Sequence, residues 1–231
     1  MFSENASLSK LIRQRPIVIE LLETTGHSFW NHLDMTVESF CRETGTDFAE
    51  LLRVAETMPV PSSDSDWNRE RSYRIVDFLN AEHRQFRDED IPILDRLFSR
   101  QDSSELPNSF GMKFAYQTFK SFAESFLEHM HEEEEHVFPY ILRLEDVCTL
   151  NLESEFHPTH QISATMIASL GHVYEQHLDQ LALNTGSLKD EMSDFKNRLL
   201  LHAKLEIEVL FPRAKAMEKR LEARRNILVF A

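Results

Sequence analysis

The chain has 231 residues, of which 42% are hydrophobic and 10% aromatic. It can therefore bury the core of one large domain, or of a main domain with a small one attached. The net charge of −14 disfavours binding to nucleic acid or to an anionic membrane surface, because both require basic patches. Only five glycines and eight prolines occur, which argues against a protein of strands and turns.

The two cysteines, Cys41 and Cys148, have no paired spacing. This pattern excludes a disulfide framework and a thiolate zinc site, and it fits a reducing compartment. The N-terminal residues lack the apolar segment of a signal peptide, and no stretch approaches the length of a membrane span. We therefore expect a soluble cytoplasmic protein.

The first part of the chain contains three short helical patterns. The first is expected to stop at Gly26 and the second at Gly45, and the third begins at Asp47. A stretch with two prolines and a Ser/Asp cluster, residues 58–66, predicts a linker. We place a small N-terminal helical domain at residues 1–60 and the main domain at residues 67–231.

The main domain contains four amphipathic helical patterns joined by short connections. They cover about residues 67–100, 111–143 and 158–186, and the fourth begins at residue 188. Pro92 is expected to kink or interrupt the first. This order of elements predicts an all-α fold, an antiparallel up-down-up-down four-helix bundle.

One motif occurs twice, in the second and the fourth patterns. A His is followed by a Glu four residues later and by a Phe-Pro pair five residues after the Glu, in His129–Pro139 and again in His202–Pro212. Residues i and i+4 lie on the same face of a helix, so each copy offers one imidazole and one carboxylate together. Both pairs lie on apolar stripes, where a carboxylate is costly without a partner. Two such helices facing each other predict a shared metal site.

The rest of the acidic run around the first copy is assigned to the surface. Three glutamates are expected on a solvated face: Glu132, Glu134 and Glu135. His131 is expected to be exposed. His136 lies seven residues after His129 and could approach the site, but a role on the helix surface is favoured.

The first and third patterns are expected to complete the site. His83 lies on the apolar stripe of the first pattern. In the third, His160 is in phase with an apolar stripe and is chosen, while His177 on a second apolar stripe and His172 on a polar face stay as alternatives. A single His on a helical stripe is more often a core residue than a ligand. The candidate metal ligands are His83, His129, Glu133, His160, His202 and Glu206.

Four imidazoles and two carboxylates exceed the three or four protein ligands usual for one zinc ion. The number suits two metal ions with both carboxylates bridging. Nitrogen and oxygen ligands without thiolate fit iron or manganese, and zinc can also enter such sites.

These residues carry a resemblance to a known family. Residues 67–231 resemble a hemerythrin-like bundle, and the whole chain resembles the repair-of-iron-centres family of di-iron proteins. The resemblance is carried by His83 with Ile91-Pro92, by both copies of the doubled motif, and by the small residues that follow His160. The first sixty residues resemble the N-terminal domain of that family. Where the family typically has a Cys-Cys pair, this chain has the stretch 29–32, Phe-Trp-Asn-His.

The resemblance implies two non-haem Fe ions, oxo- or hydroxo-bridged, with Glu133 and Glu206 as bridging carboxylates. It implies small diatomic ligands, O2 or NO, damaged iron–sulfur proteins as partners, and a monomer or homodimer. The function so implied is repair of iron–sulfur centres in the response to nitric oxide or oxidative stress. A carrier or sensor of O2 or NO without turnover is the alternative, which the missing Cys pair favours. A helical interaction protein that has lost its metal is the third hypothesis. No general acid or base is assigned.

Overall fold

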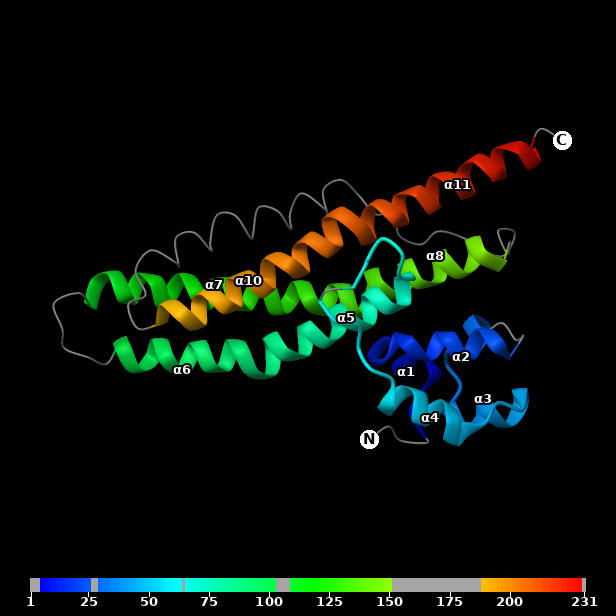
Figure 1. Ribbon diagram of the computed structural model, residues 1–231, viewed down its shortest axis with the longest axis horizontal. Coiled ribbons are helices and arrows are strands. Elements are labelled where there is room, and N and C mark those ends of the chain that lie inside the picture. The colour runs from blue at the N-terminus through cyan, green and yellow to red at the C-terminus, as the bar shows by residue number, and fades with distance from the viewer. Residues whose placement is uncertain (1–4, 26–28, 64, 103–108, 151–187, 230–231) are drawn as a thin grey trace.

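The computed structural model describes residues 5–25, 29–63, 65–102, 109–150 and 188–229 (Figure 1). Within these ranges the regular structure is helical, and the only pairing of extended segments is an isolated bridge between Ser7 and Thr36. The predicted all-α fold is therefore confirmed. The predicted third helix of the bundle, with His160, His172 and His177, lies outside the described residues. None of the described helices is both long enough and apolar enough to cross a lipid bilayer.

The N-terminal region is a cluster of short helices, in which Gly45 and Asp47 mark helix ends as the sequence predicts and a 3-10 turn divides the first predicted pattern into two helices. Its elements are α1 (Leu8–Gln14), the 3-10 turn η1 (Pro16–Val18), α2 (Ile19–Thr24), the 3-10 turn η2 (Phe29–His32), α3 (Val37–Thr44) and α4 (Phe48–Thr57). The Asp47 side chain accepts the amide hydrogens of Ala49 and Glu50, which caps α4. Gly45 ends α3 with a φ of 73°, a left-handed conformation that glycine adopts at no steric cost. The predicted stop at Gly26 lies outside the described residues.

The described part of the main domain contains three long helical rods that lie side by side (Figure 1). Each rod is an α-helix, one π-helical turn and a second α-helix in unbroken succession. The first rod is α5 (Ser72–Gln85), η3 (Phe86–Asp90) and α6 (Ile91–Asp102). The second is α7 (Ser109–Glu132), η4 (Glu133–Val137) and α8 (Phe138–Leu150), and the third is α10 (Lys189–Leu205), η7 (Glu206–Leu210) and α11 (Phe211–Val229).

Each π-helical turn is followed by a proline at the second position of the next helix, namely Pro92, Pro139 and Pro212. A proline inside an α-helix has no N–H to donate and clashes with the carbonyl four residues earlier. Here the amide before each proline reaches back five residues, for example from Ile91 to the carbonyl of Phe86, so the extra residue relieves the clash. The predicted interruption at Pro92 therefore takes the form of a π turn, and the rod continues through it.

The rods enclose a core rich in phenylalanine. Phe86 meets Phe126 and Phe195 edge-on, with ring centroids 5.4 and 5.6 Å apart. The N-terminal helices pack against the bundle through the apolar turn η1, in which Ile17 and Val18 are buried. The buried side chains of both regions therefore form one continuous core.

Candidate metal centre

Four side chains from the three rods converge at the level of the π turns. His83 comes from α5 and His202 from α10, while Glu133 and Glu206 are the first residues of η4 and η7. One ligand atom from each of the four lies within 4.8 Å of the others. All four residues are at most 1% exposed. The structure thus brings together four of the six residues that the sequence predicts as metal ligands.

The contacts within this group are short. His202 Nε2 lies 3.0 Å from Glu206 Oε1, as the spacing of four residues predicts. His83 Nε2 lies 3.2 Å from His202 Nε2 and 3.5 Å from Glu133 Oε2. The ring nitrogens of two imidazoles thus point at each other and at the carboxylates.

The carboxylates of this group are poorly satisfied by the protein. Neither oxygen of Glu133 or of Glu206 receives a well-aligned hydrogen bond from a described residue. His202 Nδ1 is likewise buried without such a partner in the described part of the chain. Buried charged groups without hydrogen bonds are costly, so native proteins normally pair them or bind a metal ion there.

The pKa values of the buried carboxylates and imidazoles are shifted as well. Burial, together with the adjacent Glu206 carboxylate, raises the pKa of Glu133 well above 4.5. Burial opposes ionisation of Glu206 as well, but the adjacent His202 lowers the pKa of Glu206 below 4.5. Burial lowers the pKa of His83 to about 4, so this imidazole is neutral at pH 7. Neutral imidazole is the form that binds metal.

His129 lies at the side of this group. Its Nε2 is 3.1 Å from Glu133 Oε1, and its side chain is 27% exposed. The atom is buried and has no well-aligned hydrogen bond with a described residue. Burial lowers the pKa of His129, which again favours the neutral imidazole. His129 can therefore approach a metal that Glu133 binds, although it is not one of the four mutually close ligands.

Glu134 is a functional residue that the sequence reasoning missed. It was expected on a solvated face, but it is half-buried and its Oε1 accepts a hydrogen bond of 3.0 Å from His83 Nδ1. The Arg87 guanidinium donates to the same carboxylate at 3.2 Å. A carboxylate on Nδ1 fixes the tautomer and orientation of a ligand imidazole and leaves Nε2 free for metal. The sequence feature that indicates this role is the position of Glu134, directly after the predicted ligand Glu133 and within the π turn that precedes Pro139.

The other residues of the acidic run lie on the surface. Glu135 is exposed, but it is paired with Arg13 of the N-terminal region, so it also joins the two parts of the molecule. Glu132 is 59% exposed and pairs with His136 at 3.2 Å. His131 is exposed, as predicted.

Aromatic rings shield the four ligands from water. Phe138 stacks on His83 with ring centroids 5.7 Å apart, and Phe86 meets His202 edge-on at 5.8 Å. Both phenylalanines are at most 1% exposed. They keep the local dielectric low, so a metal ion there would interact strongly with the carboxylates.

These observations test whether the residues fit a metal. Two imidazoles and two carboxylates lie close together, and their unsatisfied buried atoms carry negative charge that a cation would balance. Nitrogen and oxygen donors without thiolate suit iron, manganese or zinc. The donor set therefore fits a divalent metal.

Comparison with known families gives the same result. Residues 74–214, more than half of the chain, match the family described as the hemerythrin HHE cation binding domain. This range contains all four clustered residues and His129. No curated protein matched the chain. The chain therefore belongs to the hemerythrin HHE cation-binding family, whose members bind iron.

Proposed function

We propose that the protein holds a non-haem di-iron centre that binds NO or O2 in the response to nitrosative or oxidative stress, including the repair of iron–sulfur centres. The observation that carries this proposal is the buried group of two imidazoles and two carboxylates with unsatisfied atoms. Carboxylates from facing helices that share metal ions are a recurrent design of helical bundles.

Each residue of the site has a part in this proposal. The two ions would be held by the carboxylates of Glu133 and Glu206 and by the imidazoles of His83, His129 and His202. Glu134 holds His83 in the tautomer that exposes Nε2. When bound, ferrous ions supply the electrons that binding or reduction of a diatomic ligand requires. Phe86 and Phe138 exclude water from that surface.

His160 is the predicted ligand from the third helix of the bundle, with His172 and His177 as alternatives. Comparing iron content in the three single His→Ala variants tests this assignment. We expect the largest loss for His160→Ala. Equal content in His160→Ala and wild type, with a loss in one of the others, would move the assignment to that residue.

The metal content itself is the primary test. After anaerobic loading with ferrous iron and removal of excess, we expect about two iron ions per chain. The variant Glu133→Ala/Glu206→Ala should retain almost none, because both bridging carboxylates are gone. A matched control is Glu132→Ala/Glu208→Ala, which removes two glutamates that are 59% and 61% exposed in the same two rods. Unchanged iron content in the Glu133/Glu206 variant would refute the site.

A binder without turnover is the second candidate, and the N-terminal region favours it. Phe29 and Trp30 occupy the stretch where the similar family typically has a thiol pair, and both are buried. The two cysteines of the chain, Cys41 and Cys148, are buried and are not joined in a disulfide. Neither thiol therefore offers an exposed sulfur for redox chemistry.

Reaction with NO separates the two candidates. The reduced, iron-loaded protein is mixed with excess NO and an excess of an electron donor under anaerobic conditions, because each N2O formed from two NO consumes two electrons, and N2O is measured in the gas phase. Catalytic N2O formation, or reactivation of a damaged iron–sulfur enzyme, supports repair chemistry. Stoichiometric uptake of NO without N2O and without reactivation supports the binder. No uptake at all would count against both.

A further inference from the structure

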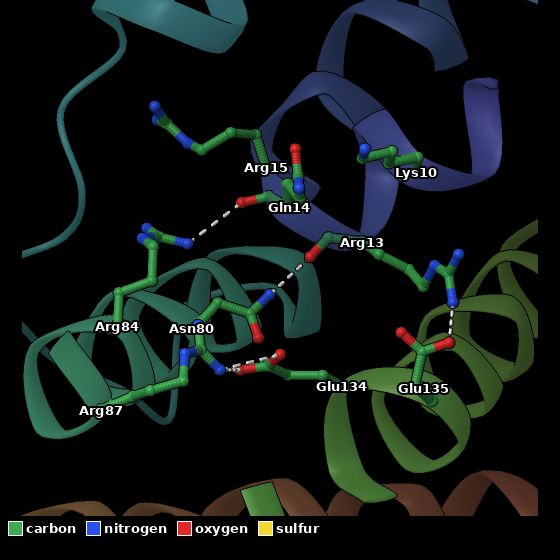
Figure 2. Close-up of a pocket in the computed structure, with 9 residues that line it drawn as sticks. All are labelled: Lys10, Arg13, Gln14, Arg15, Asn80, Arg84, Arg87, Glu134 and Glu135. Atoms are coloured by element: carbon green, nitrogen blue, oxygen red, sulfur yellow. Dashed lines mark hydrogen bonds and ion pairs between the residues drawn. The ribbon is translucent and has the colours of Figure 1, made fainter. Parts of the chain in front are cut away.

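A cavity of about 520 Å³ lies between the N-terminal helices and the first two rods (Figure 2). Its volume falls within the range of sites for small molecules. Five basic side chains line it, together with two carboxylates, although the chain as a whole carries a net charge of −14. The basic residues are Lys10, Arg13, Arg15, Arg84 and Arg87. A positively charged cavity is unexpected in a protein with a negative net charge, and it indicates an anionic ligand.

Three of these cations are already paired within the protein. Arg13 pairs with Glu135, and Arg87 pairs with Glu134 at 3.2 Å (Figure 2). Arg15 has a structural role, because its guanidinium pairs with the buried Asp77 carboxylate at 3.1 Å.

The other two cations have no carboxylate partner in the described ranges. Arg84 is half-buried and donates only to the carbonyl of Gln14, at 3.3 Å. Burial lowers the pKa of Arg84, and the nearby carboxylates of Asp77 and Glu134 oppose this shift only in part. Lys10 is exposed at the rim and makes no ion pair with a described residue. An oxyanion in the cavity would supply charge-assisted hydrogen bonds to both.

A neutral side chain of the wall joins the bundle to the N-terminal region. Asn80 is 3% exposed and donates from Nδ2 to the carbonyl of Arg13 at 2.8 Å. Its Oδ1 is buried and accepts no hydrogen bond from any described residue.

We propose that this cavity binds a small, multiply charged oxyanion of the phosphate or carboxylate class, held by Lys10, Arg84 and Arg87. The N-terminal region supplies Lys10 and the bundle supplies both arginines. A bound anion therefore bridges the two parts of the molecule. Linkage then stabilises the docked arrangement by RT ln(1 + L/Kd), where L is the concentration of free anion.

The site is also joined to the metal centre by hydrogen bonds. Arg87 binds Glu134, and Glu134 accepts from His83, whose Nε2 faces the other ligands. An anion that draws Arg87 away leaves the Glu134 carboxylate less neutralised, which makes His83 a more basic ligand. We therefore expect the anion and a divalent metal to favour each other's binding, by about fivefold or more. This coupling rests on the proposed metal site, whereas the anion site itself does not.

The anion site is tested on the metal-free protein, so chelation plays no part. Pyrophosphate and citrate are titrated by calorimetry at constant ionic strength, and the tighter of the two identifies the class of ligand. Arg84→Gln and Lys10→Gln should each weaken binding about tenfold, a loss of about 1.4 kcal/mol. Lys204→Gln removes an exposed cation outside the cavity and should bind as wild type does. Circular dichroism and the melting temperature verify that each variant is folded.

Two results would overturn the proposal. One is that the wild type binds neither probe, and the other is that Arg84→Gln binds as tightly as Lys204→Gln. The coupling is tested separately, by measuring Mn²⁺ affinity in sulfate against chloride at equal ionic strength. Tighter Mn²⁺ binding in sulfate, absent in Arg84→Gln, supports it. Equal affinity refutes the coupling, and no Mn²⁺ binding in either salt refutes the metal site while the calorimetry still stands.

Discussion

The molecule buries charge both at the seam between its N-terminal region and the bundle and in the group around Glu133 and Glu206. At the seam some of these charges meet partners from the chain itself, although Arg84 and Lys10 beside the cavity have no carboxylate partner among the described residues. Asp77, which is fully buried, is paired with Arg15 at 3.1 Å. Arg71 forms a two-pronged pair with Glu23 at 2.6 and 2.7 Å.

In the metal centre the charges are only partly balanced: His202 lies 3.0 Å from Glu206 Oε1, and each of the two shifts the pKa of the other towards the charged form. Glu133 lies against Glu206, and the imidazoles of His83 and His202 face each other. The protein thus pairs the fully buried carboxylate of Asp77 at the seam, whereas neither oxygen of Glu133 in the metal centre receives a well-aligned hydrogen bond from a described residue. Burial by itself therefore does not identify a binding site. Burial of charged groups that lack hydrogen-bonding partners in the protein does identify such a site, because only a bound ligand can then offset the free-energy cost of their desolvation.

The largest effect should come from breaking compensation at the seam. Arg15→Met leaves Asp77 buried without its partner and removes hydrogen bonds to the carbonyls of Ala55 and Met58. We expect a loss of about 3–5 kcal/mol in the free energy of unfolding, measured by chemical denaturation. Arg53→Met is the control, because Arg53 pairs with Glu50 on the surface, where water screens the pair, so this variant should lose much less stability. Similar losses of stability in Arg15→Met and Arg53→Met would contradict the expected difference between a buried and an exposed ion pair.

The next largest effect concerns the orientation of a metal ligand. Glu134→Gln replaces the charged acceptor of His83 Nδ1 with a neutral one of the same shape. Metal affinity should fall about 10–100-fold, as measured by competition with a chelator. Glu132→Gln removes the charge of an exposed neighbour and should change affinity little. If the two variants bind equally, Glu134 does not position His83.

In the metal-free protein, neutralising a carboxylate of the centre should stabilise the fold. Glu133 has a folded-state pKa raised above 4.5, so the folded protein holds this proton more tightly than the unfolded chain does. Stability is therefore lost as pH rises above 4.5. Glu133→Gln removes this loss, and we expect a gain of at least about 1 kcal/mol at pH 7. Denaturation curves at several pH values should show the gain disappearing below pH 4.5. If Glu133→Gln were less stable than the wild type at pH 7, the predicted direction of the stability change would be wrong.

The smallest effect is expected at the edge of the seam. Arg71 is 35% and Glu23 is 22% exposed, so water screens their pair. A double-mutant cycle with Arg71→Gln and Glu23→Gln should give a coupling of about 0.2–1 kcal/mol. A coupling as large as the loss in Arg15→Met would show that depth of burial does not set the strength of pairs at this seam.

Much of the site could be predicted from the sequence because its geometry is local. His129 with Glu133 and His202 with Glu206 are four residues apart on apolar stripes, and helical periodicity alone puts each pair on one face. His83 could be chosen because it lies on the apolar stripe of its own helix. The structure places His83, Glu133, His202 and Glu206 within reach of one ion.

Glu134 was misassigned because the necessary information is not local. An α-helix turns about 100° per residue, so the neighbour of a core glutamate is expected on a different face. The neighbouring rod decides otherwise, because α5 brings His83 and η3 brings Arg87 against that carboxylate. The same holds for the cationic cavity, whose basic residues come from separate stretches of the chain.

By itself the sequence determined the helical fold and the repeated His–Glu motif, because helical periodicity and capping are properties of neighbouring residues. The prolines that follow each π turn are also visible in the sequence. Only the tertiary structure decided which charges are compensated. Glu135 and Arg15 find partners across the seam, while Glu133 and Glu206 meet each other. That outcome depends on which helices pack together. It distinguishes the charged groups that are paired within the protein from those that lack a partner and are expected to bind a ligand.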